Sequence, residues 1–320
     1  MEKIKHISRI NLEELPAASI TRYWLELTTD TLGNEVCIPV IIAKGAEKGP
    51  VLGLTAAVHG NEVNGIPVIQ RVISSINPAL LTGILIGVPV VNVPALTDKV
   101  REFNDGKDLN HVFPGKTKGN ESEVYAYRFF HSVVSHLDYL IDLHTASFGR
   151  VNSYYIRADL RDPVTAELAR LQNAQIVVNN MPSDGTLRGA ANELDIPAIT
   201  LEVGNPNTFQ RGLIRSSMTG IYNAMAYLKM LDVPIEEPAS PPVYCRTSYW
   251  LYTDTGGFLR VIPDLAEIVT KGQLIAVQTN VFGDVVREYH APDHGIVIGK
   301  SNHPVNQSGG RILHLGLFAN

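Results

Sequence analysis

The chain has 320 residues, 45% of them hydrophobic and 18% charged, with 27 basic and 32 acidic side chains. The net charge of −5 argues against nucleic acid as the main partner, because binding to a phosphate backbone needs a basic surface. No apolar stretch is long enough to span a bilayer, and the first residues lack the apolar run of a secretory signal, so we expect a cytoplasmic protein with no membrane partner.

Apolar runs of strand length alternate with amphipathic stretches of helix length between Val36 and Leu231. Asn120 with Glu123 forms a capping-box pattern, which predicts the start of a helix. The alternation is typical of an α/β fold, with a mixed, largely parallel sheet flanked by helices. The predicted strands are 51–58, 84–91, 139–143, 175–178 and 198–203, and further helices are predicted at 63–76 and 212–231.

A proline-rich stretch at residues 233–242 cannot continue a helix and predicts a linker. It would separate a domain of residues 1–235 from a domain of residues 243–320. Beyond it, a glycine-led pattern that begins at Gly257 returns weakly at Gly295, and two such halves indicate a small all-β barrel-sandwich domain. The repeat is weak enough that two unrelated sets of short strands would also produce it. We interpret this domain as a wall or lid for the site, or as an oligomer contact.

Two polar motifs lie where predicted strands end, which is where open α/β sheets collect their ligands. His59-Gly60-Asn61-Glu62 follows the strand at 51–58, and a His and a Glu three apart on a first helical turn can face one point. His144 ends the strand at 139–143, and Asp142 points to the same side because strand side chains alternate. Two imidazoles and one carboxylate, from His59, Glu62 and His144, leave a position open for water, as in catalytic zinc sites. Asp142 would then accept a hydrogen bond from the His144 ring nitrogen that does not bind the metal.

Two further charged residues are candidates for catalysis. Glu202 interrupts the apolar strand at 198–203, where a carboxylate is costly unless it is paired or used. It could act as a general base beside a metal-bound water, or it could be a salt-bridged structural residue. Arg101 lies in a long polar loop and could stabilise an oxyanion or remain a solvated surface arginine. In the same loop, Asn110 could fix a polar group of the substrate.

Four motifs occur in a fixed order and together carry a resemblance to a known family. They are His59-Gly60-Asn61-Glu62, Arg101 ahead of Asp108-Leu109-Asn110, Asp142-Leu143-His144-Thr145 and Leu201-Glu202-Val203-Gly204. This set resembles the succinylglutamate desuccinylase/aspartoacylase family, which is related to zinc carboxypeptidases, over about residues 51–205. The resemblance implies a zinc-carboxypeptidase-like fold and a zinc-dependent amidohydrolase that removes an acyl group from a small N-acylated amino acid or amine. It implies one zinc per chain held by His59, Glu62 and His144, with Glu202 as general base, Arg101 beside the oxyanion and Asn110 at the substrate.

One position departs from the family pattern. The family usually has an arginine directly after Asp-Leu-Asn, and that arginine grips a substrate carboxylate, but here the residue is His111. An arginine offers a fixed bidentate fork, whereas a histidine offers single donors and titrates near neutrality. We therefore expect a substrate with a weaker or absent carboxylate at the subsite of His111, such as an N-acylated diamine or diamino acid.

Two alternatives to a small-molecule deacylase follow from the same motifs. One is a metallocarboxypeptidase acting on small peptides, although a terminal carboxylate would favour arginine over His111. The other is a non-catalytic binding protein on the same scaffold, although such a protein would not need the complete ligand set together with Glu202. The sequence leaves open whether copies of the chain form a homo-oligomer.

Overall fold

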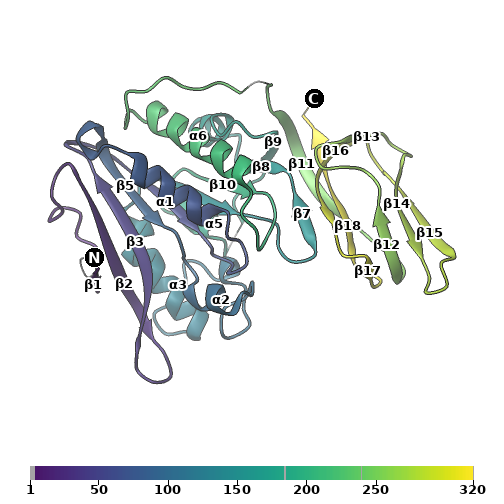
Figure 1. The fold of residues 1–320 in the computed structure, drawn as a ribbon, viewed down its shortest axis with the longest axis horizontal. Helices are drawn as coiled ribbons and strands as arrows, with labels where there is room; N and C mark the ends of the chain where they lie inside the picture. Colours follow the sequence, from purple (N-terminus) through teal and green to yellow (C-terminus); the bar gives the residue numbers. More distant parts are fainter. Residues whose placement is uncertain (1–3, 184, 239, 320) are drawn as a thin grey trace.

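The computed structural model describes residues 4–183, 185–238 and 240–319, and one large mixed sheet extends through most of the molecule (Figure 1). The α-helices are α1 (Gly65–Ser75), α2 (Val93–Asp98), α3 (Glu121–Ser132), α4 (Pro163–Arg170), α5 (Leu187–Asn192) and α6 (Arg211–Tyr227). The strands before the proline-rich stretch are β1 (Lys5–Ile7), β2 (Ser19–Thr29), β3 (Glu35–Lys44), β4 (Glu47–Ala56), β5 (Thr82–Val88), β6 (Tyr139–His144), β7 (Arg150–Asn152), β8 (Tyr154–Ala158), β9 (Ile176–Asn179) and β10 (Ala198–Val203). The strands after it are β11 (Val243–Tyr252), β12 (Gly257–Val261), β13 (Ile268–Val269), β14 (Leu274–Thr279), β15 (Val285–His290), β16 (Gly295–Ser301), β17 (Val305–Asn306) and β18 (Arg311–Phe318).

The centre of the large sheet is parallel, in the order β5-β4-β6-β10, and the flanking strands are mixed in direction. These four strands correspond to the predictions at 84–91, 51–58, 139–143 and 198–203. Asn120 and Glu123 form the predicted capping box at the start of α3. The prediction of an α/β fold built on a largely parallel central sheet is therefore confirmed. No helix within the described residues is long and apolar enough to cross a membrane.

Helices cover both faces of the central sheet, with α1 and α6 on one face and α3 on the other (Figure 1). Neighbouring residues of one strand therefore enter different cores, because side chains alternate along a strand. On β6, Ile141 lies in the buried cluster that includes α1 and α6, whereas Leu140 lies in the cluster that includes α3. Burial on both faces explains why these strands are continuous apolar runs, and why the polar residues stand at the strand ends.

The strands after the proline-rich stretch form two layers. A separate sheet has the order β15-β14-β12-β17, while β11, β18, β16 and β13 extend the large sheet. The two predicted repeats exchange short strands, since β13 of the first pairs with β16 and β17 of the second pairs with β12. The extension begins where β11 pairs in parallel with β9. The predicted boundary between residues 235 and 243 stays a prediction, with no helix or strand among the described residues from α6 to β11.

Candidate active site

A short turn after β4 carries the first two predicted ligand residues. The Glu62 amide donates to the His59 carbonyl at 3.1 Å, and Nδ1 of His59 lies 2.9 Å from Oε1 of Glu62. The expectation that these residues begin a helix is wrong, because α1 starts only at Gly65. Gly60 is needed for close packing, since a Cβ there would lie 2.0 Å from the backbone of Ala95 in α2. The turn packs against α2 and places the His59 imidazole beside the Glu62 carboxylate.

His144 joins this pair from the end of β6. Its Nδ1 lies 3.0 Å from Oε2 of Glu62, and one donor atom from each of His59, Glu62 and His144 lies within 4.8 Å of the others. All three residues are buried. The predicted ligand set, from segments 82 or more residues apart in sequence, is thus brought together at the carboxyl ends of β4 and β6.

The donor atoms of this cluster suit a divalent cation. His59 Nδ1 is buried and faces Glu62 Oε1 at 2.9 Å without making a hydrogen bond, so a cation between these two atoms would be bound by both. The opposite ring nitrogens are held by carboxylates, since His59 Nε2 donates to Asp108 at 2.9 Å and His144 Nε2 donates to Asp142 at 2.7 Å. Carboxylates placed behind imidazoles in this way fix the ring orientation and raise its basicity in metal sites.

Charges in the cluster are strongly coupled. Burial alone would lower the pKa of the His144 imidazole, but Asp142 and Glu62 outweigh burial and raise that pKa well above its usual value. Burial alone would raise the pKa of Glu62, but His59 and His144 outweigh it and hold that pKa well below its usual range. The Glu62 carboxylate therefore stays ionised and attracts a cation to the site.

Arg101 and Asp108 form a polar bridge beside this cluster. Arg101 donates to Asp108 Oδ2 from Nε at 2.9 Å and to Glu62 Oε1 from Nη1 at 3.1 Å, and it also donates to Ser147. Ser147 in turn donates to Glu62 at 2.9 Å. Arg101 is therefore an anchored residue at the site and not a free surface arginine. In the sequence, Asp108 stands out only as part of the Asp108-Leu109-Asn110 motif, and its loop position gives no signal that it bonds His59.

Glu202 lies on β10 directly opposite His144 on β6 in the parallel register. Its side chain is 10% exposed, accepts a hydrogen bond from Asn152 at 3.2 Å and forms an ion pair with Arg157 at 3.3 Å. The carboxylate thus lines the same cavity as His59, Glu62 and His144 while it is held by two polar partners. This geometry is compatible with Glu202 as a general base and with Glu202 as a salt-bridged structural residue.

Asn110 and His111 both line the cavity, but they are held differently. Asn110 Oδ1 accepts a hydrogen bond from the Leu187 amide at the start of α5, at 2.8 Å. His111 is 68% exposed, and its Nε2 lies 3.7 Å from Asp108. Asn110 is therefore fixed at the wall, whereas His111 lies at the mouth.

The cavity around these residues has a volume of about 230 Å³ and a cationic wall that the sequence alone does not reveal. Arg150, Arg157 and Arg188 line it together with Arg101. Trp250 of β11 also lines it, so the segment after the proline-rich stretch contributes to the wall. Arg157 interrupts an apolar strand just as Glu202 does, and a charged residue within an apolar run is the sequence signal that indicates it. For Trp250 the sequence offers no comparable signal.

Comparison with known proteins gives a family match over residues 48–228, to the succinylglutamate desuccinylase/aspartoacylase catalytic domain. Among curated proteins, the N-alpha-acetyl-L-2,4-diaminobutyric acid deacetylase of Halomonas elongata is 26% identical over 278 residues, covering 83% of this chain and 81% of that protein. A succinylglutamate desuccinylase of Pseudomonas aeruginosa is 31% identical over 184 residues, or 51% of this chain and 53% of that protein.

Solved structures share the fold over nearly the whole chain. The product-bound ectoine utilization protein EutE (DoeB) from Ruegeria pomeroyi has a TM-score of 0.86 at 22% identity, and it covers 95% of this chain and 98% of that one. A succinylglutamate desuccinylase/aspartoacylase from Rhodobacter sphaeroides has a TM-score of 0.87 at 20% identity, with 98% and 99% coverage. At these identities the similarity concerns the fold.

Proposed function

Because the chain belongs to the succinylglutamate desuccinylase/aspartoacylase family, we propose that it is a zinc-dependent amidohydrolase that removes an acyl group from the nitrogen of a small N-acylated amino acid. The observation that carries this proposal is the convergence of His59, Glu62 and His144 in a cavity that Glu202 also lines. Two imidazoles and a carboxylate are the ligands of several catalytic zinc sites, and they leave room for water and substrate.

A zinc ion held by these three residues would lower the pKa of a coordinated water toward about 7 and polarise the amide carbonyl. Glu202 accepts the proton of the attacking water and returns it to the departing nitrogen, as a general base and then a general acid. Asn152 and Arg157 orient its carboxylate for both transfers.

Arg101 supplies positive charge where the oxyanion develops. Its contacts with Glu62 and Asp108 hold the guanidinium at the cavity wall before substrate arrives, so little reorganisation is needed during the reaction. Asn110 presents its Nδ2 donors to a polar group of the substrate, since its Oδ1 is occupied by the Leu187 amide.

For the substrate, we infer an N-acylated diamino acid such as N-acetyl-2,4-diaminobutyrate. Two observations support it: His111 stands where the family usually has an arginine, and the relative from Halomonas elongata carries a name with that substrate class. The cationic wall favours a second candidate, because Arg150, Arg157 and Arg188 could bind a dicarboxylic substrate such as N-succinylglutamate.

A substrate screen separates these candidates. The zinc-loaded protein is incubated with N-acetyl-2,4-diaminobutyrate, N-succinylglutamate, N-acetylaspartate and a dipeptide, and the released amine is measured. We expect the highest kcat/KM on the first compound and no release by the His59→Ala variant, which should also lose about one zinc per chain.

A clear preference for N-succinylglutamate or N-acetylaspartate would assign the acidic substrate class instead. Preference for the dipeptide would favour a metallocarboxypeptidase. Zinc binding without hydrolysis of any of a wider panel of N-acyl amines would favour a binding protein.

A further inference from the structure

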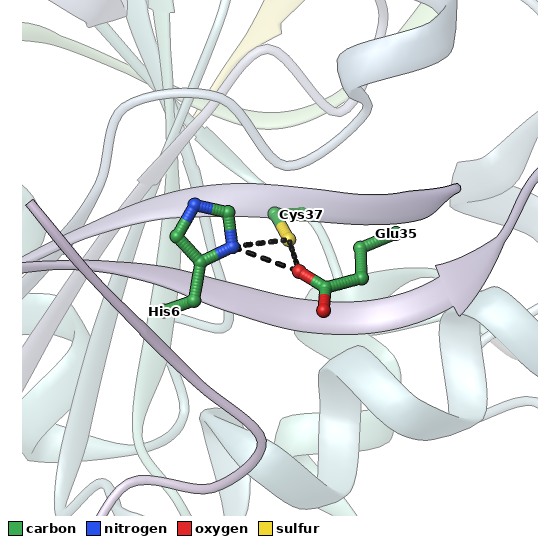
Figure 2. A group of neighbouring side chains, drawn as sticks. All are labelled: His6, Glu35 and Cys37. Atoms are coloured by element: carbon green, nitrogen blue, oxygen red, sulfur yellow. Dashed lines mark hydrogen bonds and ion pairs between the residues drawn. The ribbon is translucent and has the colours of Figure 1, made fainter.

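A second group of metal-ligating side chains lies on the outer face of the N-terminal strands, apart from the cavity. His6 on β1 and Glu35 and Cys37 on β3 point toward one another across β2 (Figure 2). The opposite face of these strands packs into the core through residues such as Leu25 and Ile38. Strand alternation therefore directs the three polar side chains outward together.

The distances in this group are close to those of a metal site. His6 Nδ1 lies 2.8 Å from Glu35 Oε2, and Cys37 Sγ lies 3.8 Å from each of those atoms. Zinc bonds of about 2.0–2.1 Å to nitrogen and oxygen and about 2.3 Å to sulfur separate tetrahedral donors by roughly 3.3–3.6 Å. Side-chain shifts of about half an ångström would therefore complete the set. We propose that His6, Glu35 and Cys37 form a second site for a thiophilic divalent cation such as zinc.

Geometry argues against a Cys-His-Glu nucleophile built from the same residues. A catalytic imidazole uses one ring nitrogen for the nucleophile and the other for the carboxylate. Here the single Nδ1 of His6 faces both Sγ and the carboxylate. Three donors that converge on one point are what a cation requires.

A neighbouring carboxylate adds to the attraction for a cation. Glu26 on β2 pairs in register with Cys37 on β3, so the two side chains lie on the same face of the sheet. Its charge adds to that of Glu35 around the thiol. The mixture of one sulfur, one nitrogen and one oxygen ligand selects zinc over calcium or magnesium, which prefer oxygen ligands alone.

A cation at this site would stabilise the attachment of β1 to the sheet. This three-residue strand lies at the edge of the sheet and pairs only with β2 among the described residues. A cation shared by His6 and Cys37 would tie β1 to β3 as well, across 31 positions of sequence. We expect bound zinc to slow hydrogen exchange at residues 5–7 while the central strands are unaffected.

Cobalt substitution distinguishes this site from the catalytic one, because the cluster of His59, Glu62 and His144 contains no sulfur. The 320-residue protein is stripped with a chelator and titrated with Co²⁺, and the near-ultraviolet sulfur-to-cobalt charge-transfer band is recorded. Because the cluster of His59, Glu62 and His144 also takes up cobalt, we expect the band to saturate by about two equivalents in the parent protein and by about one in His59→Ala. The band should be lost in Cys37→Ser and should need more cobalt in His6→Ala or Glu35→Gln. Matched controls are Cys245→Ser, which removes a buried thiol elsewhere, and His59→Ala; both should keep the band.

Absence of the band in the cobalt-loaded protein would overturn the site, as would a band that survives Cys37→Ser. A band that forms at the same cobalt concentration in both His6→Ala and Glu35→Gln would rule out the three-ligand set. Circular dichroism of each variant verifies that a lost band does not come from unfolding. None of these results depends on amide hydrolysis, so the proposal stands or fails separately from the proposed function.

Discussion

Replacing Glu202 with glutamine tests the proposed general base with little change in shape. The amide keeps an oxygen that can accept from Asn152, but it cannot carry a proton between water and the leaving nitrogen. We expect kcat to fall about 10²–10⁴-fold, the usual contribution of acid–base catalysis, which corresponds to about 3–5 kcal/mol in the activation free energy. Zinc content should stay near one equivalent at the catalytic site, since Glu202 is outside the ligand cluster.

The effect of the same substitution on stability should be small. The lost ion pair with Arg157 spans 3.3 Å, and the arginine side chain is 36% exposed, so solvent screens the interaction. Arg157 also keeps its hydrogen bonds from the guanidinium to the Tyr155 hydroxyl. We expect a loss of about 1 kcal/mol or less in the free energy of unfolding, or a Tm decrease of at most about 2 °C.

A matched control is Glu167→Gln, which removes the ion pair with Arg170 on the surface of α4, away from the cavity. It should shift Tm by a similar amount and leave kcat unchanged. Steady-state kinetics, thermal unfolding and metal analysis on both variants complete the assay. Near-normal turnover in the zinc-loaded Glu202→Gln protein would refute the base assignment and leave Glu202 as a structural residue.

Three further predictions follow from the site and its wall. Asp142→Asn should weaken catalytic zinc binding by about 10–100-fold in a chelator competition, because His144 loses its charged partner; unchanged affinity would contradict the support role. Trp250→Ala should raise KM by roughly two- to tenfold with little change in kcat, since an aromatic contact contributes about 0.5–1.5 kcal/mol; an unchanged KM would remove Trp250 from the substrate wall. Burial lowers the pKa of His314 to about 3, so below its unfolded pKa of about 6.5 the unfolded chain binds a proton that the folded chain does not. The free energy of unfolding therefore decreases as pH falls from about 6.5 toward 3, by about 2 kcal/mol at pH 5. Between pH 7 and pH 5, denaturant titrations should show a correspondingly smaller decrease for His314→Gln than for the parent protein. An equal decrease in the two proteins would contradict this.

The sequence predicts the central strands and the ligand cluster because both depend on local signals. Strands β4, β6 and β10 are apolar runs buried on both faces, and the polar residues directly after or within them, such as His59, His144 and Glu202, stand at one edge of the sheet. Strand direction and chain order are then enough to place these side chains near one another.

Contacts between distant loops and strands are not recoverable in this way. Asp108 bonds His59 across 49 positions because a loop without a periodic pattern folds back onto the turn after β4. Trp250 reaches the cavity only because β11 pairs beside β9. The pattern at Glu35 and Cys37 indicates a shared face of one strand, but not that β1 brings His6 to them. Periodicity reports which face of an element is buried and does not identify the neighbour.

The pairing of β11 with β9 makes the proline-rich stretch a poor place to cut the chain. Val243 and Cys245 of β11 lie opposite Ile176 and Val178 of β9, and Cys245, Ile176 and Val178 are all buried. A fragment ending before β11 would expose the open hydrogen-bonding edge of β9 to solvent, together with apolar side chains. Such an edge recruits strands from other molecules, so the fragment should aggregate rather than behave as an independent hydrolase.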